Sequence, residues 1–337
     1  MTDYFNLEPN EQIVLLEAAA RDALSHWDLE GASLDLIKHR ENAVYEARIG
    51  AFRGALRLHR FGYHSDIELL SELQWMQALA KADIRTPKII PTSDGRLFVN
   101  HLSDSLPAEL QIDMFEWIDG RQLGSVEEGV ASETNVTDTY TAIGELAARV
   151  HNQSAEWQLP PGFARHAWDA DGIAGQAPLW GQFWKLESAT EVEATLLENA
   201  RDKVYADLSS IEKSSANYSL IHADFTPENV MVDANGVRLI DFDDAGFGWH
   251  LFELATSLYF LKSEPCFDQA KSGLIEGYRR HRALTDEHLE LLPLFFLARG
   301  LTYVGWVHTR HETETARELS PMILAMACEQ AEHYLQN

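Results

Sequence analysis

Hydrophobic and polar residues follow the period of a β-strand along much of the first third of the chain. Five short stretches are predicted to be strands: residues 34–37, 44–49, 55–60, 88–99 and 111–117. An Asp94-Gly95 turn divides the fourth stretch. The first three follow each other closely, so we expect them to be antiparallel neighbours in one sheet.

A helical pattern lies between the third and fourth stretches. Ser65 and Glu68 have the spacing of a capping box, in which each residue satisfies a backbone amide of the first helical turn. Apolar residues then recur at helical spacing: Ile67, Leu70, Leu73 and Leu79. The sequence therefore predicts a helix that begins directly after Ser65.

Beyond Asp119-Gly120 the pattern becomes mainly helical. Residues 136–152 have the period of an amphipathic helix, and a single β-rich segment, 220–242, interrupts the helical part. These patterns predict an α+β fold with a small antiparallel sheet and a helix in one lobe and mainly helices in the other. We expect three parts: an N-terminal lobe over 1–115, a linker over 116–120 and a C-terminal lobe over 121–337.

The charge balance narrows the range of partners. The chain has 27 basic and 53 acidic residues, a net charge of −26. Such a surface repels the phosphates of nucleic acids and of anionic membranes, so neither is an expected partner. It attracts cations.

The cysteines and the apolar segments indicate in which cellular compartment the protein is expected. Cys266 and Cys328 have neither metal-binding nor redox spacing, and the first residues are too polar for a signal peptide. The most apolar stretch, 291–307, is short and is interrupted by Pro293 and Arg299, which predicts a buried helix rather than a membrane span. We therefore expect a cytoplasmic protein.

The β-rich segment contains the residues that point to chemistry. His222, Asp224 and Asn229 precede one short strand, an Asn235-Gly236 turn follows that strand, and Asp241 ends the next. An Asn-Gly turn is typical of a two-residue hairpin, which would bring Asn229 close to Asp241. Carboxylate and amide oxygens are ligands that suit Mg²⁺.

This spacing matches the catalytic loop of kinases. In that loop an Asp orients the acceptor hydroxyl and accepts its proton, while an Asn and a later Asp hold Mg²⁺. By this match we expect Asp224 to be the base and Asn229 and Asp241 to be the metal ligands. We expect His222 to support the loop by hydrogen bonding, and Asp243 either to support the metal site or to shape the loop.

The chain resembles the aminoglycoside phosphotransferase and choline kinase family, whose fold is similar to that of protein kinases. The likeness extends from about residue 30 to about residue 310. The run DFDDAGFGWHLFELA, residues 241–255, is similar to the branch that includes stress response kinase A and type II homoserine kinases. This resemblance implies the same roles for Asp224, Asn229 and Asp241.

The resemblance also implies a nucleotide site. Arg57 stands where the family usually has a lysine that holds the α- and β-phosphates of ATP, and Glu72 stands where a glutamate pairs with that cation. Glu116 and Trp117 fall in the linker, whose backbone is expected to bind adenine. Arg60 is the competing phosphate-binding candidate.

Three departures from the family pattern affect these expectations. The phosphate-binding cation is Arg rather than Lys, and the two are not interchangeable. The loop over 38–45 contains no glycine, so it is not a glycine-rich phosphate loop. Trp249-His250 replaces the Asp-Pro that is common in antibiotic-modifying members, which weakens an antibiotic-resistance function.

The expected activity is ATP- and Mg²⁺-dependent transfer of the γ-phosphoryl group to a hydroxyl of a small metabolite, of amino alcohol, amino acid or sugar type. The first alternative is a Ser/Thr protein kinase of the stress response kinase A type, and the second is a non-catalytic nucleotide-binding scaffold. Arg299, within an apolar helix, needs a buried acidic partner or binds a substrate carboxylate. The sequence gives no oligomeric state.

Overall fold

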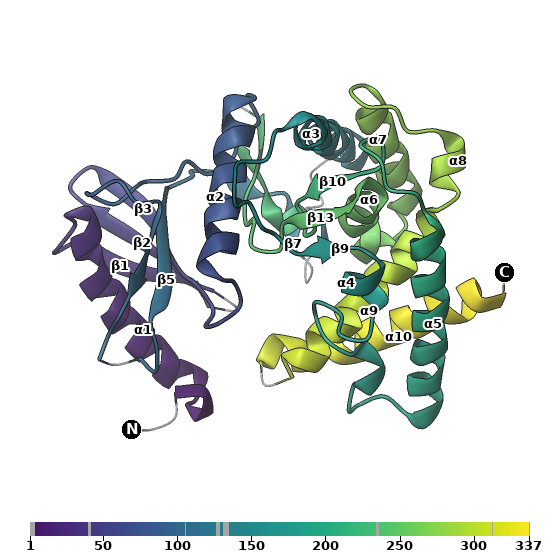
Figure 1. Cartoon of the computed structure of the whole chain (residues 1–337), viewed down its shortest axis with the longest axis horizontal. Helices are drawn as coiled ribbons and strands as arrows, with labels where there is room; N and C mark the ends of the chain where they lie inside the picture. The colour runs from purple at the N-terminus through teal and green to yellow at the C-terminus, as the bar shows by residue number, and fades with distance from the viewer. Residues whose placement is uncertain are drawn as a thin grey trace. The chain divides into compact units, whose positions relative to one another are not determined.

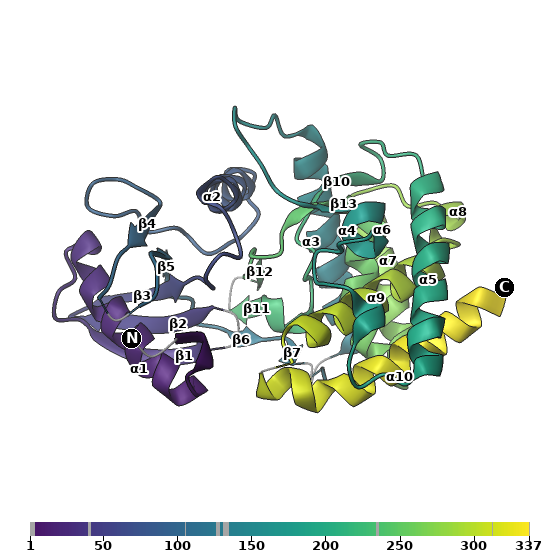
Figure 2. The ribbon, with the colours of Figure 1, turned by 60° about the horizontal axis from the view of Figure 1, so that its bottom comes forward.

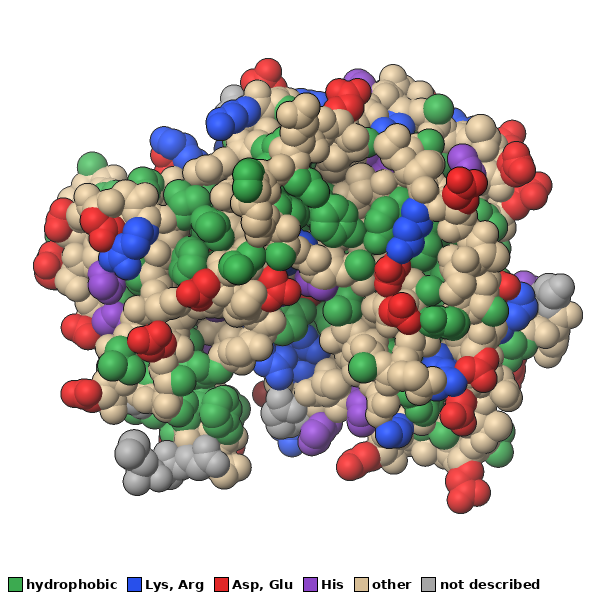
Figure 3. Space-filling view, in the orientation of Figure 1, with side chains coloured by type: hydrophobic (Ala, Val, Ile, Leu, Met, Phe, Trp, Pro, Cys, Tyr) green, Lys and Arg blue, Asp and Glu red, His purple; other side chains and the backbone are tan. Residues whose placement is uncertain are grey.

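We describe the protein from a computed structural model. It describes residues 4–39, 42–104, 106–125, 129–130, 135–233, 236–311 and 313–336. The chain forms two compact units, one made of residues 1–119 and 159–164 and the other of 120–158 and 165–337. The short segment 159–164 thus belongs with the first unit, although the sequence pattern placed it in the C-terminal lobe. Acidic side chains are spread over the face shown in Figure 3, in keeping with the net charge of −26.

A five-stranded antiparallel sheet forms the centre of the first unit, in the order β1-β2-β3-β5-β4 (Figure 1 and Figure 2). Its strands are β1 (Ser33–His39), β2 (Ala43–Ile49), β3 (Phe52–Leu58), β4 (Phe98–His101) and β5 (Leu110–Glu116). The three predicted N-terminal strands are present. The predicted start of the fourth stretch at residue 88 is wrong, because Ile89 makes only an isolated bridge to Phe115. Pro87 and Pro91 flank it, and proline has no amide hydrogen for a ladder.

The predicted capping box begins helix α2 (Asp66–Lys81). The Ser65 hydroxyl oxygen accepts from the Glu68 amide at 3.4 Å, and the Glu68 carboxylate accepts from the Ser65 amide at 2.8 Å. The buried face differs from the predicted stripe, however, because Ile67 and Leu70 are exposed. The face that packs inward contains Leu69, Glu72, Leu73, Met76 and Leu79.

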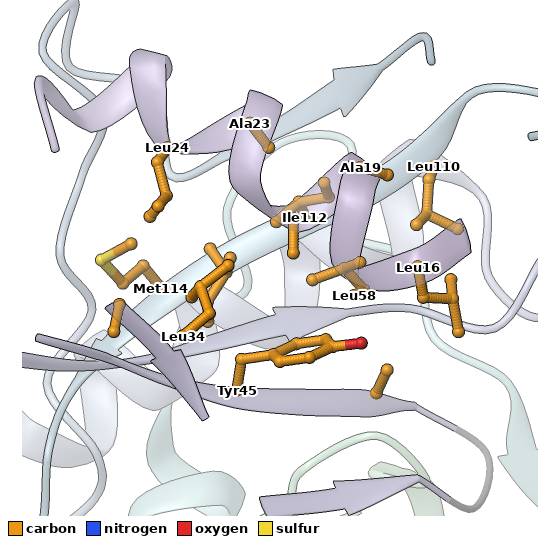
Figure 4. Close-up of a cluster of buried hydrophobic side chains, with 14 of the residues drawn as sticks. Leu16, Ala19, Ala23, Leu24, Leu34, Tyr45, Leu58, Leu110, Ile112 and Met114 are labelled. Carbon is orange, nitrogen blue, oxygen red and sulfur yellow. The ribbon is translucent and has the colours of Figure 1, made fainter. Parts of the chain in front are cut away.

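The N-terminal helix α1 (Pro9–Ala23) was not predicted. Glu8 and Glu11 form a capping box at its start, and Pro9 occupies its first turn. Leu16 and the buried alanines of this helix join the hydrophobic core that covers one face of the sheet (Figure 4). Tyr4, from a preceding 3-10 helix (Tyr4–Asn6), belongs to the same core. A second 3-10 helix, Leu24–Trp27, follows directly. The sequence signal that could have predicted α1 was a run of alanines and leucines after a weak helix cap.

The second unit is mainly helical. Its helices are α3 (Val136–Glu156), α4 (Ala170–Ala174), α5 (Glu191–Ser210), α6 (His250–Leu258), α7 (Phe267–Arg279), α8 (Asp286–Leu289), α9 (Leu292–Thr309) and α10 (Glu314–Gln336), with 3-10 turns at Phe183–Lys185, Pro227–Asn229 and Tyr259–Leu261. Helices α3 and α7 pack closely because Gly277 lies against the Thr141 carbonyl, where a Cβ would come within 2.0 Å. Helix α10 packs along α9 and α5 (Figure 2).

The described residues of the second unit also form three small sheets. One contains β10 (Tyr218–Ile221), β13 (Gly246–Trp249) and β9 (Ala167–Trp168), the next β12 (Gly236–Leu239), β11 (Val230–Asp233) and β6 (Arg121–Gln122), and the last β7 (Gly124–Ser125) and β8 (Gly129–Val130). The predicted hairpin is the pair β11–β12; residues 234–235 of its turn lie outside the described residues. Strand β13 was not predicted, because its sequence is half glycine.

The predicted apolar helix is α9. One stretch of the described residues, 286–309, is long and apolar enough to cross a membrane. In the structure 78% of the apolar 18-residue window within that stretch is buried in the protein, which is typical of a core helix.

Candidate active site

The β11–β12 hairpin places Asn229 next to Asp241. Val230 pairs with Leu239, and the amide of Ile240 donates to the carbonyl oxygen of Asn229 at 2.9 Å. Asp241 has a φ of 62°, in the left-handed region that non-glycine residues rarely adopt. Two oxygen-bearing side chains that lie twelve positions apart in the sequence are thus neighbours, as the sequence predicted.

Asp224 is held from two sides. The Asn229 side-chain nitrogen donates to Oδ2 of Asp224 at 2.7 Å and to its backbone oxygen at 2.9 Å. On the other side, Nη2 of Arg299 donates to Oδ1 at 2.8 Å. The Asp224 side chain remains 23% exposed. It is therefore a fixed carboxylate that can still accept a proton from a ligand.

A buried glutamate anchors the backbone of the same loop. Glu253 of α6 accepts from the amides of His222 at 2.8 Å and Ala223 at 2.7 Å. His222 Nε2 donates to the Ile240 carbonyl at 2.9 Å, while its Nδ1 faces the Asp224 amide at 3.3 Å. Burial lowers the pKa of His222 and raises that of Glu253. These contacts fit a supporting role for His222, as the sequence predicted.

The oxygen donors near Asp241 fit a magnesium ion. Both side-chain hydrogens of Asn229 are directed to Asp224, so its Oδ1 is the atom that a cation can take. The Asp241 side chain is exposed at the end of the hairpin. Asp243 is buried, and its carbonyl accepts from Arg165, so its backbone contributes to the shape of the loop. An amide and a carboxylate oxygen form an incomplete set that water and phosphate oxygens complete for Mg²⁺.

In the first unit, Arg57 pairs with Glu72, as the resemblance implies. Nη2 of Arg57 on β3 lies 2.8 Å from Oε1 of Glu72 on α2, and both side chains are buried. Asp113 on β5, which sequence reasoning missed, takes two further bonds from Arg57, and His59 lies 3.0 Å from the same carboxylate. The available signal was a charged residue between the apolar Ile112 and Met114 in the middle of β5.

Charge compensation favours the ionised form of Asp113. Burial opposes the charged form of Asp113, but Arg57 and His59 outweigh it, so its pKa is lowered. The competing cation Arg60 follows the end of β3, and its amide donates to the Asn42 side chain at 3.0 Å. Of the two candidates, Arg57 is the one that the buried carboxylates hold.

The linker residues Glu116 and Trp117, which were predicted to bind adenine, have no backbone amide left for it. The Glu116 amide donates to the Lys88 carbonyl at 2.8 Å, and the Trp117 amide lies 3.4 Å from the Arg53 carbonyl. The Glu116 side chain is ion-paired with Lys88. Because both amides already have acceptors, a purine at Glu116 and Trp117 would rely on carbonyl oxygens.

The tryptophans of the second unit belong mostly to its core. Trp168, Trp180 and Trp249 are buried, whereas Trp184 and Trp306 are partly exposed. The Trp180 ring packs against the Arg299 guanidinium, 4.8 Å from its centroid. Trp180 therefore supports the arginine that holds Asp224, and the buried rings do not form one open aromatic surface.

The fold and the loop together define the class of protein. One unit has an antiparallel sheet with a helix, and the helical unit has a carboxylate, an amide and a second carboxylate on a loop and the hairpin that follows it. This is the architecture of a kinase. The model of the phosphotransferase enzyme family (APH) matches residues 35–284, well over half of the chain. The chain belongs to this family and is an ATP-binding kinase.

Individual relatives agree with this assignment. The amicoumacin kinase of Bacillus subtilis (strain 168) is 23% identical over 326 residues, which cover 94% of this chain and 90% of the relative. The solved structure of a microcompartment-associated aminopropanol kinase is 31% identical, with a TM-score of 0.84 over 95% of this chain and 98% of the other. The structure of the amicoumacin kinase hAmiN with AMP-PNP, Ca²⁺ and Ami is 21% identical, with a TM-score of 0.74 over 95% and 93%.

Proposed function

We propose that the protein transfers the γ-phosphoryl group of ATP, with Mg²⁺, to a hydroxyl of a small amino alcohol. The observation that supports this is the carboxylate of Asp224, fixed by Asn229 and Arg299 but still partly exposed. A group of this kind can orient a hydroxyl, which is the main requirement of phosphoryl transfer.

In the proposed reaction, Asp224 accepts a hydrogen bond from the acceptor hydroxyl and takes its proton. The acceptor oxygen attacks the γ-phosphorus, the bond from that phosphorus to the β–γ bridging oxygen breaks, and ADP leaves. Asn229 and Asp241 would hold Mg²⁺, which supplies positive charge to the phosphates. Arg57 contributes a further cation for the phosphates of ATP, with Glu72 and Asp113 fixing its side chain.

Two observations favour an amino alcohol over an amino acid or a sugar. The net charge of −26 attracts an ammonium group and repels a carboxylate. The relative with a TM-score of 0.84 is named for aminopropanol, which has both an ammonium group and a hydroxyl. The substrate would therefore bind as a cation and react through its oxygen.

The test is ADP release with Mg²⁺-ATP and a panel of amino alcohols, hydroxy amino acids, sugars, aminoglycosides and a generic protein substrate. We expect an amino alcohol to give the highest kcat/KM, and Asp224→Ala to lower kcat by about 10²- to 10⁴-fold. Asp202→Ala, which removes an exposed carboxylate from α5, is the matched control. Labelling of protein alone, or ATP binding without turnover on any acceptor, would overturn the proposal.

A further inference from the structure

Arg299 is a fully buried cation in the middle of the core helix α9. Its exposed fraction is 0%, and its guanidinium carbon lies 4.0 Å from the ring centroid of Tyr303 and 4.8 Å from that of Trp180. Burying a cation in this way costs free energy, and an apolar side chain of similar size usually serves helix packing as well or better. Packing alone therefore does not explain an arginine at this position.

Both terminal nitrogens of its guanidinium donate to the proposed catalytic loop. Nη2 donates to Oδ1 of Asp224 at 2.8 Å, and Nη1 donates to the Ala223 carbonyl at 3.0 Å. Ala223 has a φ of 63°, so the same guanidinium holds a residue whose backbone is in an unfavourable conformation. Both terminal nitrogens are thus used inside the protein, and binding of a substrate carboxylate, one of the two roles that the sequence left open, is not supported.

The two oxygens of Asp224 have different partners on opposite sides. Arg299 of α9 binds Oδ1, and Asn229 of the same loop binds Oδ2. A carboxylate held at one oxygen only can still rotate about its side-chain bonds, whereas two donors from separate elements fix its plane. The loop supplies one of these donors, and a helix 75 positions away in the sequence supplies the other.

We infer that Arg299 is a positioning residue for phosphoryl transfer, which holds the Asp224 carboxylate in the orientation that meets the acceptor hydroxyl. This inference rests on the proposed role of Asp224. Arg299 touches neither ATP nor acceptor in this scheme. Its loss should therefore affect the chemical step and leave nucleotide binding nearly unchanged, because productive geometry depends on small displacements of the reacting groups.

The first experiment compares steady-state kinetics of Arg299→Met and Arg299→Lys with the unmodified enzyme. Arg299→Met should lower kcat by about 10²-fold and change KM for ATP by less than about threefold. The kcat of Arg299→Lys should lie between those of Arg299→Met and the unmodified enzyme, because an ammonium keeps the charge but lacks the planar fork that reaches Ala223 and Asp224 together. Arg282→Met is the control: it removes another arginine of the same unit, which donates to Asn152 at 2.7 Å.

The second experiment tests whether Arg299 acts through Asp224. Single-turnover ADP formation is measured for Asp224→Asn with and without Arg299→Met. If the arginine acts only by orienting this carboxylate, the second substitution changes the residual rate by less than about threefold, since coupled residues are strongly non-additive. A further loss of about 10²-fold in the Asp224→Asn background would overturn the inference.

The outcomes separate the inference from the proposed function. If Asp224→Ala is inactive while Arg299→Met and Arg299→Lys both keep the normal kcat, the positioning role is wrong and the proposed base remains. If Asp224→Ala keeps full activity, the proposed function itself is wrong. Circular dichroism and ATP-analogue binding identify a misfolded Arg299→Met, in which case Arg299→Lys decides: a normal kcat for this variant rejects the inference.

Discussion

Arg57 and Asp113 lie directly opposite each other on neighbouring strands, and the Arg57 guanidinium donates to both carboxylate oxygens, at 3.0 and 2.6 Å. Glu72 accepts a third bond from the same guanidinium. Two buried carboxylates thus share one cation, and the sheet positions that cation through a cross-strand pair rather than through the helix alone. The arrangement links the stability of the first unit to the proposed phosphate contact.

Arg57→Met should therefore affect both properties. It leaves Asp113 and Glu72 buried without their cation, which should lower the free energy of unfolding by about 3–5 kcal/mol. KM for ATP should also rise, because the proposed phosphate contact is lost. Urea unfolding and ATP titration measure the two effects. Arg96→Met, which removes an exposed ion pair with Asp94, should change stability by less than about 1 kcal/mol; an equally small effect for Arg57→Met would contradict the prediction.

Asp224→Ala should destabilise the protein although its side chain is partly exposed. It removes the carboxylate that faces the fully buried Arg299, and an uncompensated buried charge costs about 3 kcal/mol, the low end of the range for buried pairs. Asp224→Ala combined with Arg299→Met should recover more than half of that loss, because the cation is then absent as well. Urea unfolding of both variants checks this; a double variant less stable than Asp224→Ala would refute it.

Asp241→Asn should weaken Mg²⁺ while leaving the fold intact. Asparagine tolerates the left-handed φ of 62° that this position requires, so the backbone need not change. Loss of a negative ligand should raise the Mg²⁺ concentration for half-maximal activity by at least about tenfold. The measurement is initial rate against free Mg²⁺ at saturating acceptor. An unchanged Mg²⁺ dependence would remove Asp241 from the metal site.

Two buried histidines should make stability fall in mild acid. The rings of His151 and His250 are stacked 4.2 Å apart, and burial lowers the pKa of each well below 6.5. Below pH 6.5 the unfolded chain binds protons that the folded protein does not, so the free energy of unfolding decreases as pH falls. Each such histidine contributes at most about 1.4 kcal/mol per pH unit.

The pH effect is tested with His250→Phe, which keeps an aromatic ring beside His151. The free energy of unfolding is measured between pH 5 and 7.5. Its slope against pH should be shallower in this variant than in the unmodified protein, and the difference should correspond to the uptake of at most one proton on unfolding. His288→Phe, which replaces a histidine outside the stacked pair, is the comparison variant. Equal slopes for the unmodified protein and His250→Phe would show that His250 does not couple to folding.

The sequence by itself determined the features that depend on near neighbours. Strand periodicity located the first three strands, Ser65 and Glu68 located the start of α2, and the spacing of Asp224, Asn229 and Asp241 predicted the loop and hairpin. In each case the physical cause lies within about twenty residues: side-chain alternation, a capping box or a tight turn. Local causes of this kind can be read directly from the chain.

Local patterns also misled where packing decided the outcome. Ile67 and Leu70 fit an apolar stripe but are exposed, because α2 packs inward with the side that contains Leu69 and Leu73. Strand β13 forms although it is half glycine, since it pairs with β10 and β9 on either side. Hydrogen-bonding partners on both edges outweighed its poor strand propensity.

Only the tertiary structure decided which charged groups meet. The bonds of Arg57 to Asp113 and of Arg299 to Asp224 join residues 56 and 75 positions apart. The sequence predicted that Arg299 needs a buried acidic partner but not that the partner is the proposed base. An ion pair depends on where two side chains come to lie after separate elements pack, whereas a motif requires only spacing within one segment. The sequence could therefore name the catalytic loop, and packing alone could show what holds its carboxylate in place.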